Sequence, residues 1–248
     1  MKQLMENWRR YVALNEMDSR IQKQLNNLLE LGNIGIAVTN DGFARAVRYV
    51  LITDPDAEHP QFHDMAFPGD ITWEHVEDED DYYDNPDKYR LYGQVEFYKA
   101  DPKHDGNCHD GWIIMATGAE QGWGPLLYEV ALEWASQKGG GLTADRGIVS
   151  PKAMAVWDKY AKRSDVDVRQ MDISHELDGA KLGRHQAVQK NYPQITPDQP
   201  ADDCDQGKAV AMAGPDWSDT SVSKMYYKET PEIMQALKSA GRLIIVSD

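Results

Sequence analysis

Gly118-Ala-Glu-Gln-Gly-Trp-Gly-Pro-Leu-Leu127 is the stretch that decides the fold, because an apolar run enters it and a helical pattern leaves it. Upstream, Trp112-Ile-Ile-Met-Ala-Thr117 is short, apolar and bounded by turn residues, which predicts a buried strand. Downstream, apolar residues recur at helical spacing over 125–137, which predicts an amphipathic helix with one face on that strand. The stretch therefore predicts a strand, a loop and a helix.

The loop in this stretch carries two glycines before a proline. Gly122 and Gly124 lack the Cβ atoms that would keep a ligand away from the backbone. Pro125 suits the first helical turn, where its missing N–H group is not needed. N–H groups at a helix start, aligned with the positive end of the helix dipole, favour an anion. The loop is therefore a candidate site for a phosphate or pyrophosphate, and the alternative is a tight turn that binds nothing.

A second strand and helix follow the first pair. Gly139-Gly-Gly-Leu-Thr-Ala-Asp145 predicts a turn into a short strand. Ser150-Pro-Lys-Ala-Met-Ala-Val-Trp-Asp-Lys-Tyr160 predicts a helix, with Ser150 as N-cap and Pro151 at the first helical position. Two strand–helix pairs in tandem favour an α/β architecture.

These features resemble the GNAT superfamily of acyltransferases over roughly residues 90–163. In that family an R/Q-x-x-G-x-G/A loop holds the pyrophosphate of acyl-coenzyme A, and a later helix carries the pattern N-x-x-A-x-x-hydrophobic-Tyr. Gln121-Gly-Trp-Gly124 lies where the loop is expected. The helix pattern is matched in spacing by Ser150, Ala153, Val156 and Trp157.

The match departs from the family pattern at three positions. Gln121 directly precedes the first glycine, and Ala119 stands three residues before that glycine. Ser150 replaces the Asn of the helix pattern, and Trp157 replaces its Tyr. The departure at Trp157 affects the activity most, because the Tyr often serves as the general acid in the family.

The resemblance implies an α/β fold of the α+β type, with helices flanking a twisted, mixed but mostly antiparallel sheet. It also implies that strands at 111–117 and 141–145 are neighbours that splay apart to admit the pantetheine arm of the cofactor. Acetyl-coenzyme A is the implied cosubstrate, and an amine is the implied acceptor. The residues implied to bind the cofactor are Met115, Thr117, Gln121, Gly122, Trp123, Gly124, Leu126, Ser150, Ala153 and Trp157.

Acyl transfer to an amine requires that the amine lose a proton and that the departing thiolate be stabilised. In the family a carboxylate or a water chain near the central strands takes the first role, which makes Glu96 the candidate base. Tyr160 lies one helical turn beyond Trp157 and is the candidate acid. The alternatives are that Glu96 faces solvent on its strand and that Tyr160 packs in the core.

The chain is strongly acidic, with 26 basic and 41 acidic side chains and a formal net charge of −15. We expect no nucleic-acid partner, because phosphate backbones need a basic surface and no cluster of Lys and Arg stands out. The same charge permits a cationic acceptor, such as an amine-bearing small molecule or a basic peptide. We also expect no metal, since His104, Cys108, His109 and Asp110 are bunched in one loop without a second ligand pair.

The expected location is the cytoplasm. Two cysteines, Cys108 and Cys204, are too few for the disulfide framework of a small secreted protein. No apolar stretch reaches the ~20 residues that cross a bilayer, and the first eight residues lack the apolar core of a secretory signal. We therefore expect reduced thiols and no membrane association.

The first twelve residues permit two interpretations. Met1–Val12 is similar to amphipathic leaders of tailed-phage proteins, some of which direct cargo into the prohead. That similarity implies association with a phage capsid and a location in the host cytoplasm or the virion. The alternative is a helical hairpin of 1–14 and 18–31, ended by Gly32 and packed on the core.

The remaining elements follow from periodicity and turn residues. We divide the chain into a helical segment over 1–32, a GNAT-like core over 33–173 and an extension over 174–248. Strands are expected at 35–39, 44–52, 89–98, 166–171, 223–228 and 243–246, a helix at 231–240, and irregular segments at 53–87 and 174–220.

Two other functions remain open at this point. The departures at Gln121 and Trp157 are compatible with a GNAT-like chain that no longer catalyses and serves as a structural or packaged phage protein. An unrelated α/β nucleotide-binding protein would keep the phosphate loop and change the ligand. The missing Lys-Ser/Thr pair after the glycines argues against a P-loop enzyme.

Overall fold

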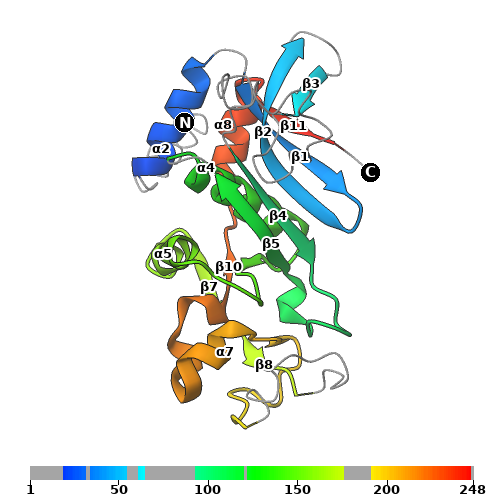
Figure 1. Cartoon of the computed structure of the whole chain (residues 1–248), viewed down its shortest axis with the longest axis vertical. Helices are drawn as coiled ribbons and strands as arrows, with labels where there is room; N and C mark the ends of the chain where they lie inside the picture. Colours follow the sequence, from blue (N-terminus) through cyan, green and yellow to red (C-terminus); the bar gives the residue numbers. More distant parts are fainter. Residues whose placement is uncertain are drawn as a thin grey trace, which may run out of the picture. The chain divides into compact units, whose positions relative to one another are not determined.

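The computed structural model describes residues 19–31, 34–54, 61–64, 93–119, 122–175 and 191–246, and its fold is mixed α/β (Figure 1). It divides into two compact units. The first comprises 1–96, 117–130 and 232–248, and the second comprises 97–116 and 131–231. The strand and the helix that flank the glycine loop each contribute residues to both units.

The strands form one large sheet and one small one. The large sheet comprises β1 (Ile34–Asp41), β2 (Ala44–Asp54), β3 (Gln61–Asp64), β4 (Gly93–Lys99), β5 (Trp112–Ala119), β6 (Leu142–Thr143), β7 (Asp167–Gln170), β10 (Lys224–Tyr227) and β11 (Leu243–Ile245). Its hydrogen-bonded order is β11-β1-β2-β4-β5-β6-β10-β7, with β3 on β2. Most neighbours run antiparallel, so the expected sheet type is confirmed.

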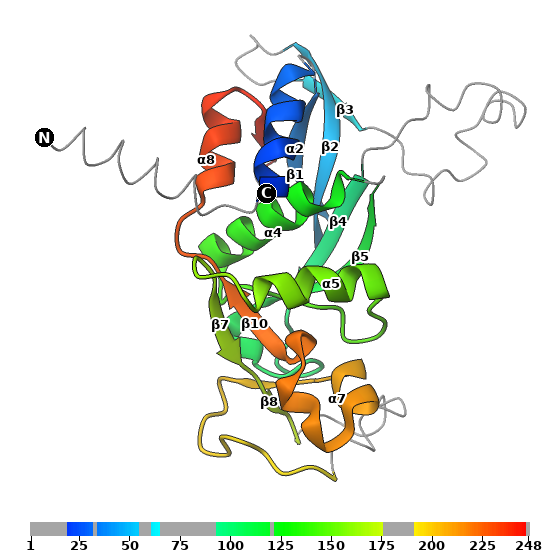
Figure 2. The same ribbon diagram turned by 90° about the vertical axis from the view of Figure 1, so that its left-hand side faces the viewer.

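In the first unit, a hairpin carries most of the pairing. β1 and β2 are antiparallel from Ile34↔Leu51 to Asp41↔Ala44, and Gly42 turns the chain with a φ of +64°. The expected hairpin is therefore confirmed. β11 pairs parallel with β1, while α2 (Ser19–Glu30) packs on β1 and α8 (Glu232–Ser239) on β11 (Figure 2). The apolar face of α2 includes Ile21, Leu25 and Leu28.

In the second unit, β5 and β6 are parallel neighbours, as expected. Their pairing covers only Trp112↔Leu142 and Ile113↔Thr143. β10 lies between β6 and β7 and is antiparallel to both. The other elements of this unit are α5 (Pro151–Tyr160), α7 (Lys208–Ala213), and β8 (Asp172–Ile173) with β9 (Asp203–Cys204), which pair parallel as the small sheet.

The helix expected over 125–137 is α4 (Gly124–Lys138), one residue longer at each end, and it is not amphipathic. Every residue from Leu126 to Ser136 is buried, including Glu129 and Glu133. The amphipathic helix that the apolar spacing predicted would have an exposed face, and these residues have none. The reason is tertiary, because Glu133 is paired with a buried lysine of the same unit.

An aromatic cluster forms part of the core of the second unit. The rings of Phe97, Trp112 and Trp134 meet edge to face, with centroids 5.7 Å, 5.5 Å and 4.8 Å apart. Such T-shaped contacts add to the stabilisation from buried area. Thus α4 contributes an aromatic ring beside the starting end of β5.

Two segments that we expected to be irregular, 53–87 and 174–220, each contain a regular element. Residues 61–64 form β3, which pairs antiparallel with β2, because the long β2 offers an edge that a four-residue strand can use. Residues 208–213 form α7, since Lys-Ala-Val-Ala-Met-Ala has a high helix propensity and buries Ala209 and Val210. The expected helix at 1–14, the cap at Gly32 and the acidic run at 77–81 lie outside the described residues.

Candidate functional site

The glycine loop joins β5 to α4, and two of its glycines have few described neighbours. Gly122 has a φ of +96°, and a Cβ built on it would meet no described atom within 4 Å. A Cβ on Gly124 would meet only the Cβ of Ala119, at an ordinary 3.5 Å. The backbone angle accounts for glycine at 122. At 124, neither a positive φ nor a close neighbour accounts for it.

Gln24 of α2 fastens this loop to the start of α4. Its Oε1 accepts a hydrogen bond from the Leu126 N–H at 2.7 Å, and its Nε2 donates to the carbonyl of Gly122. Gln24 is buried and satisfies one of the N–H groups that a helix start leaves without a partner. Sequence analysis missed this role, although a Gln on the apolar face of α2 was a signal that it has a buried partner.

Tyr49 of β2 provides a second attachment for the loop. Its hydroxyl donates to the carbonyl of Trp123 at 2.9 Å, and the two rings meet edge to face with centroids 5.3 Å apart. Burial raises the pKa of Tyr49 well above its usual range, so the hydroxyl keeps its proton as a donor. The loop is thus held from two elements of the first unit, α2 and β2.

The second half of β5 is exposed although the strand lies inside the sheet order. Met115, Ala116 and Thr117 are exposed in succession, while Trp112 to Ile114 are buried. β6 ends at Thr143 and pairs with β5 only as far as Ile113. The part of β5 that leads to the glycine loop therefore has no β6 residue in register with it. The hydroxyl of Thr117 accepts a hydrogen bond from Tyr128 at 3.2 Å.

The candidates on α5 have structural contacts in the second unit. Ser150 is the N-cap, as expected, because its Oγ accepts from the Ala153 N–H at 3.2 Å. Trp157 is buried and stacks on Tyr226, with centroids 5.2 Å apart. Tyr160 is also buried, 5.8 Å from Trp157 and 5.9 Å from Tyr226 by ring centroids. Both rings therefore belong to an aromatic cluster.

Glu96 is half-buried on β4. Its Oε1 accepts a hydrogen bond at 2.7 Å from Nε2 of Gln94, which lies two residues earlier and on the same face of the strand. Glu96, Thr117, Trp123 and the two loop glycines belong to the first unit, whereas Met115 and the α5 candidates belong to the second. Gln121 lies outside the described residues.

The polar loop at 100–111 contains a disulfide that the sequence did not indicate. Cys108 is bonded to Cys204. In the same loop, His104 contacts Asp101 at 2.5 Å, and Nε2 of His109 lies 2.9 Å from the carbonyl of Gln170. Within the described ranges, no three His, Cys, Asp or Glu side chains gather in a way that could hold a metal.

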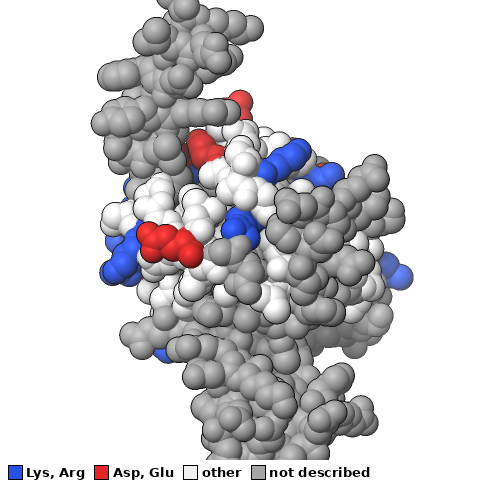
Figure 3. Space-filling view, turned by 90° about the horizontal axis from the view of Figure 1, so that it is seen from above, with Lys and Arg blue, Asp and Glu red and all other residues white. Residues whose placement is uncertain are grey.

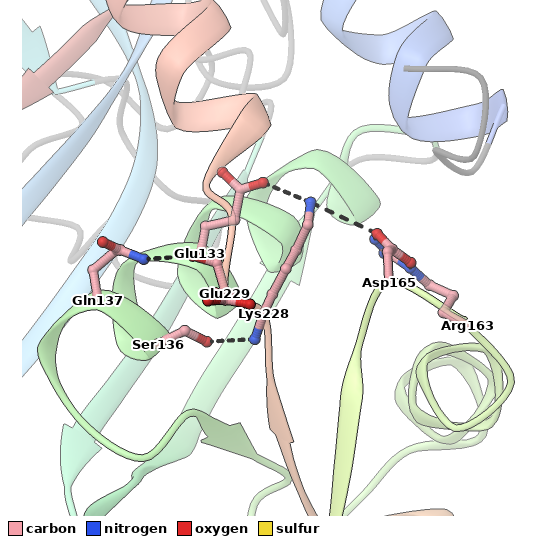
Figure 4. A network of polar contacts seen from close by, with 7 residues as sticks. All are labelled: Glu133, Ser136, Gln137, Arg163, Asp165, Lys228 and Glu229. Carbon is pink, nitrogen blue, oxygen red and sulfur yellow. Dashed lines mark hydrogen bonds and ion pairs between the residues drawn. The ribbon is translucent and has the colours of Figure 1, made fainter. Parts of the chain in front are cut away.

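A buried ion-pair network occupies another part of the second unit (Figure 4). The Nζ of Lys228 lies 2.7 Å from Glu133 and 3.9 Å from Asp165, and Lys228 and Glu133 are almost completely buried. Arg163 pairs with Asp165 in turn, at 2.5 Å. The Lys228 N–H donates to Oγ of Ser136 at 2.9 Å. Every charge of this network has an opposite charge beside it.

The face shown in Figure 3 carries both positive and negative side chains. On that face, the described Lys and Arg residues lie singly among uncharged surface, with acidic residues between them (Figure 3). None of the helices in the described part of the chain has the length and apolar character needed to span a membrane.

Comparison with known proteins gives no relative. Neither a family model, nor a curated protein, nor a solved structure matches this chain.

Proposed function

We propose that the protein is an acyl-coenzyme A-dependent N-acyltransferase that moves an acetyl group to an amine. The observation that carries the proposal is glycine at position 124. Glycine costs about 1 kcal/mol relative to alanine in a helix interior, and Gly124 stands at the very start of α4, where glycine is tolerated. Among the described residues a Cβ at 124 would make only one ordinary contact, so we assign the glycine to a ligand that approaches the backbone.

A phosphate suits this position. It would face the N–H groups and the positive dipole end of α4, a helix of 15 residues. Gln24 already takes the Leu126 N–H, so the pyrophosphate is assigned to the backbone before that residue, at Gly122, Trp123 and Gly124. The exposed half of β5, with Met115 and Thr117, leads directly into the loop and is the proposed path of the pantetheine arm.

The chemical roles stay as the resemblance implies them. Glu96 is proposed to take the proton from the amine, and Tyr160 to protonate the departing thiolate. Glu96→Gln is expected to lower turnover about 10²-fold while leaving coenzyme A affinity intact, since a base acts mainly on the chemical step. Tyr160→Phe removes only the hydroxyl and keeps the packing of the ring, and it is expected to lower turnover.

The test is calorimetric titration with acetyl-coenzyme A, coenzyme A and ATP, on the native chain and on Gly124→Ala and Gly124→Asp. Gly124→Ala is expected to fold and to bind coenzyme A more weakly. Gly124→Asp is expected to lose more than tenfold in affinity, about 1.4 kcal/mol, because it places a carboxylate against the phosphate. Unchanged coenzyme A affinity in both folded variants would show that the loop is a turn that binds no cofactor.

A catalytically inactive GNAT-like protein is the second candidate. It is favoured by the burial of Tyr160 and Trp157 in one aromatic cluster, a position typical of core residues. Such a protein would bind coenzyme A and transfer acetyl to none of a panel of amines and basic peptides. Its association with a phage capsid, and its location in cytoplasm or virion, remain predictions.

A further inference from the structure

Two side chains from distant elements hold two successive carbonyl groups of the glycine loop. The Nε2 of Gln24 on α2 donates to the carbonyl of Gly122, and the hydroxyl of Tyr49 on β2 donates to the carbonyl of Trp123 at 2.9 Å. Gln24 and Tyr49 are buried, with exposed fractions of 7% and 1%. All four residues belong to the first unit. The loop is therefore fixed through its carbonyl oxygens within one compact body.

The orientation of these carbonyls determines the orientation of two loop N–H groups. In a planar trans peptide, the carbonyl of one residue and the N–H of the next point in opposite directions, and the described chain contains no cis peptide. Because the Gly122 carbonyl points at Gln24, the Trp123 N–H points away from that side chain. The Gly124 N–H points away from Tyr49 for the same reason. Successive N–H groups directed away from the residues that hold a loop are suited to an anion.

Gln24 holds the loop without adding negative charge to it. Many helix starts are capped by Asp or carry acidic residues in the first turn, and these offset the positive end of the helix dipole. The first turn of α4, Gly124-Pro-Leu-Leu127, contains no acidic residue. The group that accepts from the Leu126 N–H at 2.7 Å is the neutral amide of Gln24. Neither this turn nor its cap therefore offsets the dipole, which can act on an anionic ligand.

We propose that Gln24 and Tyr49 are positioning residues for a phosphate site at the glycine loop. They direct the N–H groups of Trp123 and Gly124 toward the ligand, and the neutral amide of Gln24 preserves the electrostatic attraction. The inference rests on the proposed function, under which the ligand at this loop is the pyrophosphate of acyl-coenzyme A. It adds that two residues which do not contact the cofactor set its affinity.

The two positioning residues act by fixing the loop before the ligand arrives. The rings of Tyr49 and Trp123 also meet edge to face, with centroids 5.3 Å apart, so packing and hydrogen bonding hold the same peptide. A loop that is already ordered loses less conformational freedom when it binds a ligand. Removal of either side-chain donor is therefore expected to weaken binding.

The test is calorimetric titration with coenzyme A and with inorganic pyrophosphate, in about 0.15 M KCl at constant pH. Tyr49→Phe and Gln24→Met remove the donors and add no charge. Gln24→Glu keeps the size of the side chain and an acceptor for the Leu126 N–H, but it adds a negative charge beside the phosphates. Asn27→Asp places the same charge at an exposed position of α2 and is the control. Circular dichroism verifies that each variant is folded.

We expect Tyr49→Phe and Gln24→Met to lower the affinity for both ligands about twofold to tenfold, the range that corresponds to one hydrogen bond in net terms. Gln24→Glu is expected to lose more than tenfold, and Asn27→Asp to retain the native affinity. A purely structural role predicts the same loss for Gln24→Met and Gln24→Glu, because both break the bond to the Gly122 carbonyl. Equal losses in these two variants would therefore overturn the proposal.

The remaining outcomes separate this proposal from the proposed function. Native affinity in folded Tyr49→Phe and Gln24→Met proteins would overturn the positioning role alone, and these two variants decide the question if Gln24→Glu does not fold. Pyrophosphate binding that the variants weaken, without binding of coenzyme A, would support the positioning role and contradict the acyltransferase. Binding of neither ligand by the native chain would overturn both.

Discussion

Two buried groups of charged residues in the second unit differ in how their charge is compensated. Around Lys228, an ammonium and a guanidinium face the carboxylates of Glu133 and Asp165, so the chain supplies both signs (Figure 4). Around Asp172 and Asp202, the described chain supplies carboxylates, a hydroxyl and backbone N–H groups, but no cation. The comparison teaches that the chain compensates buried charge with opposite charges in one place and with hydrogen-bond donors alone in the other.

The largest effect is expected for Lys228→Met. Methionine fills a similar volume, but it leaves the Glu133 carboxylate buried without its ammonium partner. Breaking a buried pair by removing one member costs about 3–5 kcal/mol. Urea unfolding monitored by circular dichroism measures this loss, with the exposed Lys162→Met as control.

The double variant Lys228→Met with Glu133→Leu sharpens the result. Replacing both members of a buried pair with apolar residues is often close to neutral, so most of the lost stability is expected to return. If the two losses simply add, the pair is not the source of the effect, and the two buried groups would not differ in the way we describe.

A smaller loss is expected for Asp172→Asn. The substitution keeps one acceptor oxygen and places an NH₂ group where Oδ2 now accepts from Thr196. A buried donor facing a donor costs about 1–3 kcal/mol. Asp202→Asn is expected to be neutral or stabilising by comparison, since an unpartnered charged oxygen is removed from a buried position. Thermal unfolding of both variants ranks them, and the reverse order would contradict the assignment of donors.

The smallest effect is expected for Asp165→Asn, and it depends on pH. Burial raises the pKa of Asp165, but the hydrogen bond and charge of Arg163 and the charge of Lys228 outweigh burial, so the pKa lies below its ordinary value of 3.8. A folded pKa below the unfolded one stabilises the protein above pH 3.8, and this contribution is lost as the pH falls through the folded pKa. We expect at most about 1 kcal/mol at pH 7.

The measurement for Asp165 is the stability of both proteins between pH 7 and pH 3. The two curves are expected to converge as the pH falls. A constant difference over the whole range would show that the carboxylate charge does not contribute.

Local patterns predicted the elements, and distant contacts were missed. The strand, the glycine loop, α4 and the Ser150 cap follow from residues close together in sequence, and all four were predicted. Gln24 caps a helix that begins 100 residues later in the chain, and no local period indicates such a partner.

Besides these distant contacts, the sequence did not indicate which charged residues are buried. Glu129 and Glu133 have the spacing of a solvent-facing stripe, and only the fold places Lys228 beside Glu133. Similarly, Asp172 and Asp202 are separated by 30 positions and meet because β8 and β9 pair. The residue type predicts which kind of partner a buried polar group requires. The topology decides which residue lies beside it.

The disulfide between Cys108 and Cys204 has a consequence for synthesis of the chain. The two cysteines are 96 positions apart, so at typical rates of 5–20 residues per second Cys204 is made roughly 5–20 s after Cys108. Until then Cys108 has no partner in its own chain, because the protein contains only these two cysteines. In a reducing compartment the bond would not persist, and the Asp205 N–H donating to the Asp105 carbonyl at 2.6 Å would remain to hold the two loops together. The disulfide would thus form only after Cys204 is made, between two loops that this hydrogen bond already holds together.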